Sequence, residues 1–229
     1  MTSLICALVG VAMLALCGVA LRLWPKVGPI APVVAGMLLA LAYDAIIVAV
    51  GRFVGFGDVL RALNVPRLWI AAIVPPLLVL VAGYLVRRLG VEQASGRNIT
   101  LGGYALVAML ILIGVVGASR AELVPEKTGD ALRYVDDAAS GPPVPAVITV
   151  LALIVLGMAA FRYAGFPWLF LGAIIMLITG AAAFAVLWIG FLGQLVLMMS
   201  VVAAMAAVAG YRVPVVTALR DMGSRGGSR

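Results

Sequence analysis

The sequence predicts an all-α polytopic membrane protein, a bundle of about seven transmembrane helices. Of its 229 residues, 65% are hydrophobic and 11% are charged, and the mean hydropathy is +1.22. A soluble domain is about 45–50% apolar and about 25% charged, so a water-soluble fold of this size would expose too much apolar surface. The apolar residues also gather into runs of about 20, the length of a helix that crosses a bilayer.

The first five spans are separated by segments that contain charged residues, glycine or proline. We expect them at residues 4–21, 30–50, 68–86, 99–118 and 145–161. Residues 168–209 are almost wholly apolar and too long for one crossing. Aromatic residues and two glycines between Trp188 and Gly193 favour a turn, which gives spans at 168–187 and 191–209. Residues 1–210 then form a single membrane domain.

The basic residues predict the orientation of the bundle, because cytoplasmic segments carry an excess of Lys and Arg. With the N-terminus outside and the C-terminus inside, ten of the sixteen basic residues lie inside and most acidic residues lie outside. Residues 119–144 then form an outer polar loop. Residues 211–229 end in a Gly-, Ser- and Arg-rich stretch and are expected to be a flexible cytoplasmic tail. The expected location is the cell membrane.

Asp44 is the strongest candidate for a functional residue. It lies in the second span, about 10 Å below the end of the apolar run, where a charged group is costly unless it faces protein or water. On a helix Asp44 shares a face with Gly51 and Gly55, whose GxxxG spacing permits the close approach of another helix. We therefore expect Asp44 inside the bundle. It is either a proton- or cation-binding carboxylate or a packing residue bonded to Tyr43, a hydroxyl group or an Arg.

A short amphipathic helix is expected at the outer interface, near residues 57–65. Four apolar residues recur at helical spacing: Phe56, Val59, Leu60 and Leu63. Asp58 stands where an N-cap belongs, and Pro66 predicts the end of the helix. Three arginines of this region would lie at headgroup level, where they bind an anionic ligand or simply contact lipid: Arg52, Arg61 and Arg67.

The outer loop holds the remaining candidate residues, and long loops often carry function. They are Glu122, Glu126, Arg133, Asp136 and Asp137. The spacing of the carboxylates matches no EF-hand, so we expect no metal site. Residues 128–136 have the composition of one or two helical turns. The loop is expected to be solvated with internal ion pairs, or to form a lid over the bundle.

Two consecutive prolines, Pro75 and Pro76, interrupt the third span. Proline lacks the N–H that a helix uses for its hydrogen bonds, so we expect a kink and two freed backbone carbonyls. Such a position is typical of a hinge or of the wall of a cavity.

The composition excludes several chemistries. The chain has no His, which removes His-ligated haem, His-based zinc sites and Ser-His or Cys-His catalysis. Its two cysteines, Cys6 and Cys17, lie on one expected helix too far apart for a disulfide. We expect no catalytic residue, no metal and no cofactor.

The predicted function is therefore a multi-pass, non-enzymatic membrane protein that binds or moves a small or lipidic ligand with Asp44. One alternative is a structural or accessory subunit of a membrane complex. A second is an intramembrane lipid-modifying enzyme with a site on the outer face. The expected partners are the lipid bilayer and a membrane protein or a second copy of the chain, and not nucleic acid.

Overall fold

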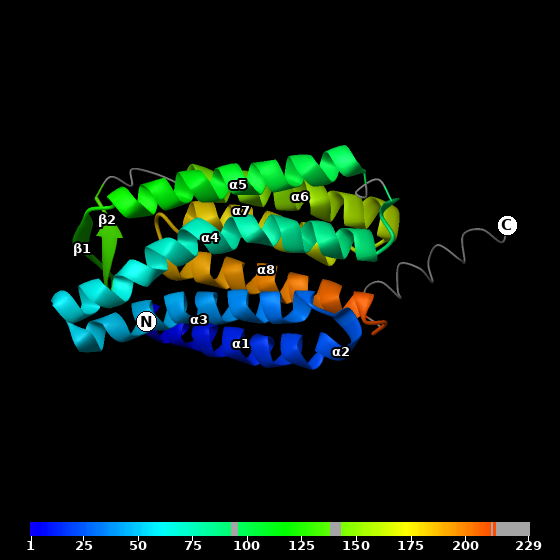
Figure 1. Ribbon diagram of the computed structural model, residues 1–229. Coiled ribbons are helices and arrows are strands. Elements are labelled where there is room, and N and C mark those ends of the chain that lie inside the picture. Colours follow the sequence, from blue (N-terminus) through cyan, green and yellow to red (C-terminus); the bar gives the residue numbers. More distant parts are fainter. Residues whose placement is uncertain (93–95, 138–142, 212, 214–229) are drawn as a thin grey trace.

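The computed structural model describes residues 1–92, 96–137, 143–211 and 213. The expected basic tail lies almost wholly outside this set, as does part of the expected outer loop. Within it the chain forms eight α-helices and one two-stranded sheet (Figure 1). The expected all-α bundle is therefore confirmed.

Six of the described helices are long and apolar enough to cross a membrane, so the chain is a multi-pass membrane protein. They are α1 (Thr2–Arg22), α3 (Ile30–Val54), α4 (Asp58–Arg88), α5 (Arg97–Arg120), α6 (Val144–Ala164) and α8 (Leu187–Val208). Helix α7 (Trp168–Ala182) is apolar but has only 15 residues. Helix α2 (Trp24–Val27) is a single turn after α1.

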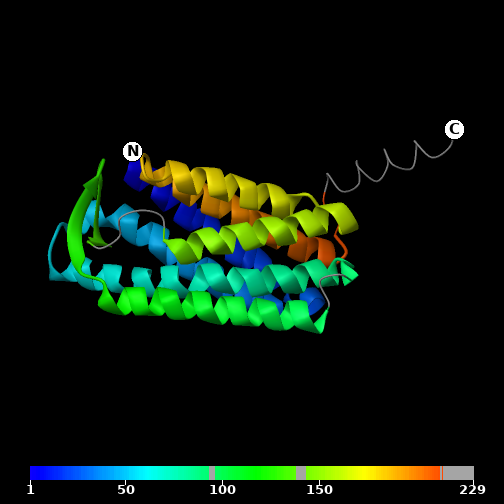
Figure 2. The ribbon, with the colours of Figure 1, turned by 90° about the horizontal axis from the view of Figure 1, so that it is seen from above.

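Helix α1 and helices α3 to α8, with α7 included, alternate in direction along the chain and lie side by side (Figures 1 and 2). Helix α1 packs mainly on α3, α4 packs on α5, and α6 and α8 pack on α7, while α8 also contacts α1. The core between them is apolar and includes Met13, Leu38, Leu85 and Met198. Helices α5 and α6 contact each other sparsely, and two cavities lie along the seam between α4, α5 and α6.

Glycines allow α6, α7 and α8 to approach closely. A Cβ at Gly157 of α6 would collide with the backbone of Phe170 in α7, and one at Gly193 of α8 would collide with the side chain of Thr179 in α7. The chain turns between α7 and α8 at residues 183–186, earlier than the expected turn near Trp188 to Gly193. That expectation is wrong because Gly193 serves helix packing and not chain reversal.

Residues 58–65 are helical but do not form a separate helix. Helix α4 starts at Asp58, has Gly57 as its N-cap, and runs through Pro66 to Arg88. The expected end at Pro66 and the expected capping role of Asp58 are therefore wrong.

Side chains add hydrogen bonds to two α4 carbonyls close to Pro66, which itself donates no backbone hydrogen bond. The Tyr43 hydroxyl of α3 donates to the Leu63 carbonyl at 2.8 Å, and Asn64 Nδ2 donates to the Leu60 carbonyl at 2.7 Å. Side chains commonly satisfy backbone groups near prolines of membrane helices in this way.

The polar segment after α5 is a β-hairpin, so the expected helical turns at residues 128–136 are wrong. Strand β1 (Leu123–Thr128) pairs antiparallel with β2 (Ala131–Asp136). Gly129 and Asp130 form the two-residue turn, and Gly129 has φ +64°. Glycine at the first central position with positive φ is typical of a hairpin turn that matches strand twist.

The two ends of the bundle differ in charge. Helix order places the hairpin and the junction between α3 and α4 at one end, here called the hairpin end (Figure 1). The opposite end, here called the basic end, has one described acid, Glu92, and six described basic residues: Arg22, Lys26, Arg87, Arg88, Arg97 and Arg162. The described basic residues that the topology prediction placed inside thus lie together at the basic end of the bundle. The orientation of this end in a membrane stays a prediction.

Candidate functional site

An ion pair joins α3 to α4 near the hairpin end. Arg67 Nε donates to Asp44 Oδ1 at 2.6 Å, and the Arg67 and Asp44 side chains are 12% and 22% exposed. Two opposite charges this close neutralise each other, which lowers the cost of keeping either among apolar helices. The sequence allowed Tyr43, a hydroxyl group or an Arg as the partner of Asp44. The structure shows that the partner is an Arg of another helix.

Asn64, which was not among the predicted candidates, completes this group. Its side chain accepts a hydrogen bond from Arg67 Nη1 and donates to the Leu60 carbonyl. The residue is 1% exposed. Asn64 and Arg67 lie one turn apart on α4, so the continuity of this helix places both beside Asp44. Tyr43 bonds to Leu63 and not to Asp44.

A cavity of about 590 Å³ opens beside the ion pair, between α4, α5, the start of α6 and β2. We call it the hairpin cavity. One side of it is polar and includes Asp44, Asn64, Arg67, Arg133 and Asp136.

The other side of the hairpin cavity consists of small or apolar residues. On α4, Leu68, Ala71 and Ala72 continue the face of Asn64 and Arg67 away from the polar groups, and the lining residues of α5 and of the start of α6 carry no charge. Helix α5 contributes two pairs at i and i+4 spacing: Ile113 with Gly117, and Gly114 with Ala118. The cavity therefore has a charged side and an apolar side, as a site for an amphiphilic molecule requires.

The double proline of α4 bears directly on this wall. Pro75 and Pro76 cannot donate to the carbonyls of Ala71 and Ala72, their i−4 positions. Both alanines line the hairpin cavity. The wall therefore contains two carbonyls without their usual helical donor, in agreement with the expectation that this motif marks a cavity.

The hairpin is held on the bundle by close packing at Gly51. A Cβ at Gly51 would collide with the backbone carbonyl of Leu132 in β2. The expected contact at the GxxxG motif was a second helix, whereas here the motif admits a strand. Gly55 is the C-cap of α3 with φ +74°, and Phe56 packs edge-on against Tyr134 with ring centroids 5.9 Å apart.

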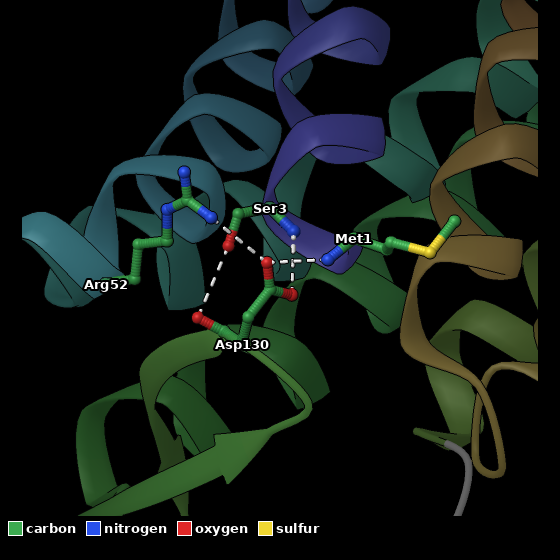
Figure 3. Close-up of polar contacts among 4 residues, drawn as sticks. All are labelled: Met1, Ser3, Arg52 and Asp130. Atoms are coloured by element: carbon green, nitrogen blue, oxygen red, sulfur yellow. Dashed lines mark hydrogen bonds and ion pairs between the residues drawn. The ribbon is translucent and has the colours of Figure 1, made fainter.

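The turn of the hairpin is anchored by Asp130 (Figure 3). Its Oδ2 lies 2.8 Å from the Met1 ammonium and 3.2 Å from Arg52 Nη1, and the Ser3 amide donates to Oδ1 at 3.3 Å. The hydrogen bond from the Met1 ammonium outweighs partial desolvation and, with that from Ser3, holds the pKa of Asp130 well below its usual range. Arg52 thus forms an ion pair with the turn of the hairpin.

A second ion pair links the two strands. Arg133 Nη2 donates to Glu126 Oε1 at 2.7 Å, and the Thr128 hydroxyl donates to the same oxygen at 2.6 Å. Burial raises the pKa of Glu126, but the hydrogen bonds from Thr128 and Arg133 lower it further, so the pKa lies below its ordinary value. Arg133 Nε is buried without a hydrogen-bond partner among the described residues, and Arg133 lines the hairpin cavity.

The structure brings only some of the predicted candidates together. Asp44, Arg67, Arg133 and Asp136 line one cavity, whereas four exposed candidates lie at the same end without lining it: Asp58, Arg61, Glu122 and Asp137. Asp136 Oδ1 accepts a hydrogen bond from the Glu122 amide. Within the described ranges, no group of three or more His, Cys, Asp or Glu is placed to hold a metal ion.

No protein family, curated protein or solved structure matches this chain.

Proposed function

We propose that this protein is a non-enzymatic membrane protein that binds an amphiphilic molecule in the hairpin cavity. The observation that carries the proposal is the division of this cavity into a charged side and an apolar side. Its volume of about 590 Å³ falls within the roughly 300–1,000 Å³ of small-molecule sites. In the orientation that the basic residues favour, this site opens towards the outer side of the cell membrane.

The polar group of the ligand would lie against Asp44, Asn64, Arg67 and Arg133. These side chains offer hydrogen-bond donors and acceptors of both signs. Arg133 Nε still has a donor to offer, and an unsatisfied buried donor is costly until a partner arrives. A head with both donor and acceptor groups fits this side better than a bare anion, because Asp44 would repel an anion.

The apolar part of the ligand would lie along α5 and the start of α6. Gly117 faces this space, and a Cβ there meets nothing within 4 Å. Val107 and Leu110, the buried residues of α5, fill the seam below the cavity, which favours binding from one side over passage across the bundle.

A photoreactive lysophosphatidylcholine with a diazirine in its acyl chain tests this proposal. The full chain is reconstituted in nanodiscs, illuminated with and without excess unlabelled lysophosphatidylcholine, and digested for mass spectrometry. We expect the competable label on α5 and α6 residues of the hairpin cavity. Gly117→Leu should remove most of it by filling the space.

Val116→Leu is the matched control, because residue 116 lies beside Gly117 in α5 but does not line the cavity. It should leave the competable label unchanged. Label that is spread over the bundle, or that is equal in the two variants, would contradict the proposal.

A role as an accessory subunit is the second candidate, favoured by the exposure of α5. In its most apolar 18-residue window only 11% of residues are buried, less than in any other of the candidate spans described. If α5 faces a second copy, Leu112→Cys should form a disulfide-linked dimer on oxidation in membranes. Leu8→Cys of α1, equally exposed, should stay monomeric. Monomeric Leu112→Cys would exclude a second copy at this face.

A further inference from the structure

A second cavity lies on the same seam, at the basic end of the bundle. It has a volume of about 280 Å³ and lies between α4, α5 and α6. We call it the basic-end cavity. Gly83 and Arg87 continue the face of α4 that lines the hairpin cavity, and Gly103 continues that of α5. Val107 and Leu110 are buried between the two cavities, so the two cavities are separate sites.

The basic-end cavity has one cationic group, Arg87. Its Nη1 lies 3.1 Å from the Thr100 hydroxyl of α5. No carboxylate within the described residues forms an ion pair with Arg87. The guanidinium has five N–H donors in a planar fork that matches the oxygens of a phosphate, so most of its donor capacity is open to a ligand.

The surrounding charge favours an anion. Arg97 lies one helical turn from Thr100 on the same side of α5, and Arg88 follows Arg87 in sequence. Glu92 is the only described acid at this end and is exposed. Positive potential at this end of the bundle therefore adds to the local attraction of Arg87.

The rest of the basic-end cavity is apolar and opens sideways. Leu80 of α4 and Val155 of α6 line it, and Val155 and Tyr104 are more than half exposed. In a multi-pass membrane protein this side faces the acyl chains. A soluble anion would leave this apolar wall without a partner, whereas a phospholipid fills both parts of the cavity.

We infer that the basic-end cavity binds an anionic phospholipid of the adjoining leaflet, with its phosphate on Arg87 and Thr100 and an acyl chain between Leu80 and Val155. This inference does not rest on the proposed function of the hairpin cavity. It identifies a lipid site at the opposite end of the protein, in the leaflet where anionic lipids and basic protein segments meet under the expected orientation.

Native mass spectrometry of the detergent-purified full chain tests this inference. Phosphatidylglycerol and phosphatidylcholine are titrated separately, and the occupancy of the tightest lipid adduct gives its Kd. We expect phosphatidylglycerol to bind more tightly than phosphatidylcholine. Arg87→Gln should weaken phosphatidylglycerol binding about tenfold, the loss expected for a charge-assisted contact.

Arg88→Gln is the matched control. It removes the same charge at the neighbouring position, but Arg88 contacts Tyr84 and does not line the cavity. It should change the Kd less than twofold. Equal losses of phosphatidylglycerol affinity in Arg87→Gln and Arg88→Gln would show that the effect comes from the net charge of this end. That result would overturn the inference of a specific site.

A second pair of variants keeps the test valid if Arg87→Gln misfolds. Gly103 lines the basic-end cavity and Gly102 does not, and a Cβ at either position meets nothing within 4 Å. Gly103→Leu should occlude the cavity and weaken phosphatidylglycerol binding, while Gly102→Leu should not. Equal binding of the two lipids, or displacement of phosphatidylglycerol by millimolar inorganic phosphate, would overturn the assignment of an anionic phospholipid.

Discussion

Arg67 of α4 donates from Nε to Oδ1 of Asp44 in α3 at 2.6 Å, and the same guanidinium donates to Asn64. The intramembrane acid that stands out in the sequence is therefore one half of an interhelical ion pair at the side of a cavity. Its partner lies 23 residues later, beyond the α3–α4 turn, so the contact also fixes how these two helices align.

Asp44→Asn should lower the thermal stability of the protein, because it leaves the Arg67 guanidinium without its counter-charge. The expected loss is about 1.5–3 kcal/mol, the range for a hydrogen bond to a charged group. The midpoint of thermal unfolding in a mild detergent measures it. Asp44→Asn combined with Arg67→Gln should recover part of the loss, since no unpaired charge remains. A double variant as unstable as the sum of the two single variants would mean that the pair is not coupled.

Gly51→Ala should loosen the hairpin from α3. Its Cβ would meet the Leu132 carbonyl, and such overpacking costs about 1–3 kcal/mol. Gly36→Ala is the control in the same helix, because a Cβ there meets nothing within 4 Å. It should be neutral or stabilising by about 0.4–1 kcal/mol. Amide hydrogen exchange of β1 and β2 reports the result, and equal exchange in the two variants would contradict the packing argument.

Docking of the hairpin should weaken in acid. The pKa values of Asp130 and Glu126 are both lowered in the folded protein, so each contributes stability above its unfolded pKa of about 4. That contribution is lost as the pH falls through the lower folded values.

Protection factors of the β1 and β2 amides, which correct for intrinsic exchange, should therefore be constant from neutral pH to about pH 5 and fall below about pH 4. Asp130→Asn combined with Glu126→Gln should lower the protection at neutral pH and flatten its pH dependence. A wild-type profile that is flat down to pH 3 would exclude a stabilising role for these carboxylates.

The expected orientation is open to cysteine labelling, because the native Cys6 and Cys17 are buried. Lys127 of the hairpin and Glu92 at the basic end are both exposed. A membrane-impermeant maleimide should label Lys127→Cys in intact cells, and Glu92→Cys only after permeabilisation. The reverse pattern would put the hairpin inside, against the distribution of basic residues.

The helices were the predictable part of this fold. A continuous apolar run of about 20 residues is a long-range signal that survives without tertiary knowledge, and the spans near 4–21, 30–50 and 99–118 match α1, α3 and α5. The interruption at Pro66 was overestimated, because Pro66 removes one backbone hydrogen bond while Tyr43 adds one at the neighbouring Leu63 carbonyl. Tyr43 comes from another helix, and sequence alone does not place it there.

The hairpin could not be predicted for a related reason. Gly129 and Asp130 are a turn signal, but the strands have only six residues each and lack a strict alternation of apolar and polar residues. Their stability depends on contacts with distant residues, such as Arg52 with Asp130 and Gly51 with Leu132. The cavity was signalled only by Pro75 and Pro76, whereas the role of Asn64 had no signal apart from its spacing to Arg67.

Helix α7 imposes a condition on the surrounding lipid. Its 15 residues, at about 1.5 Å each, give a rod of about 22 Å beside a hydrocarbon layer of about 30 Å. If α7 crosses the bilayer with its neighbours, we expect this hydrophobic mismatch to be met by bilayer thinning next to α7, at a cost of fractions of a kcal/mol per Å. A bilayer deformed along one edge of the bundle makes the protein sensitive to membrane thickness, so thinner membranes should retain it more favourably than sterol-rich ones.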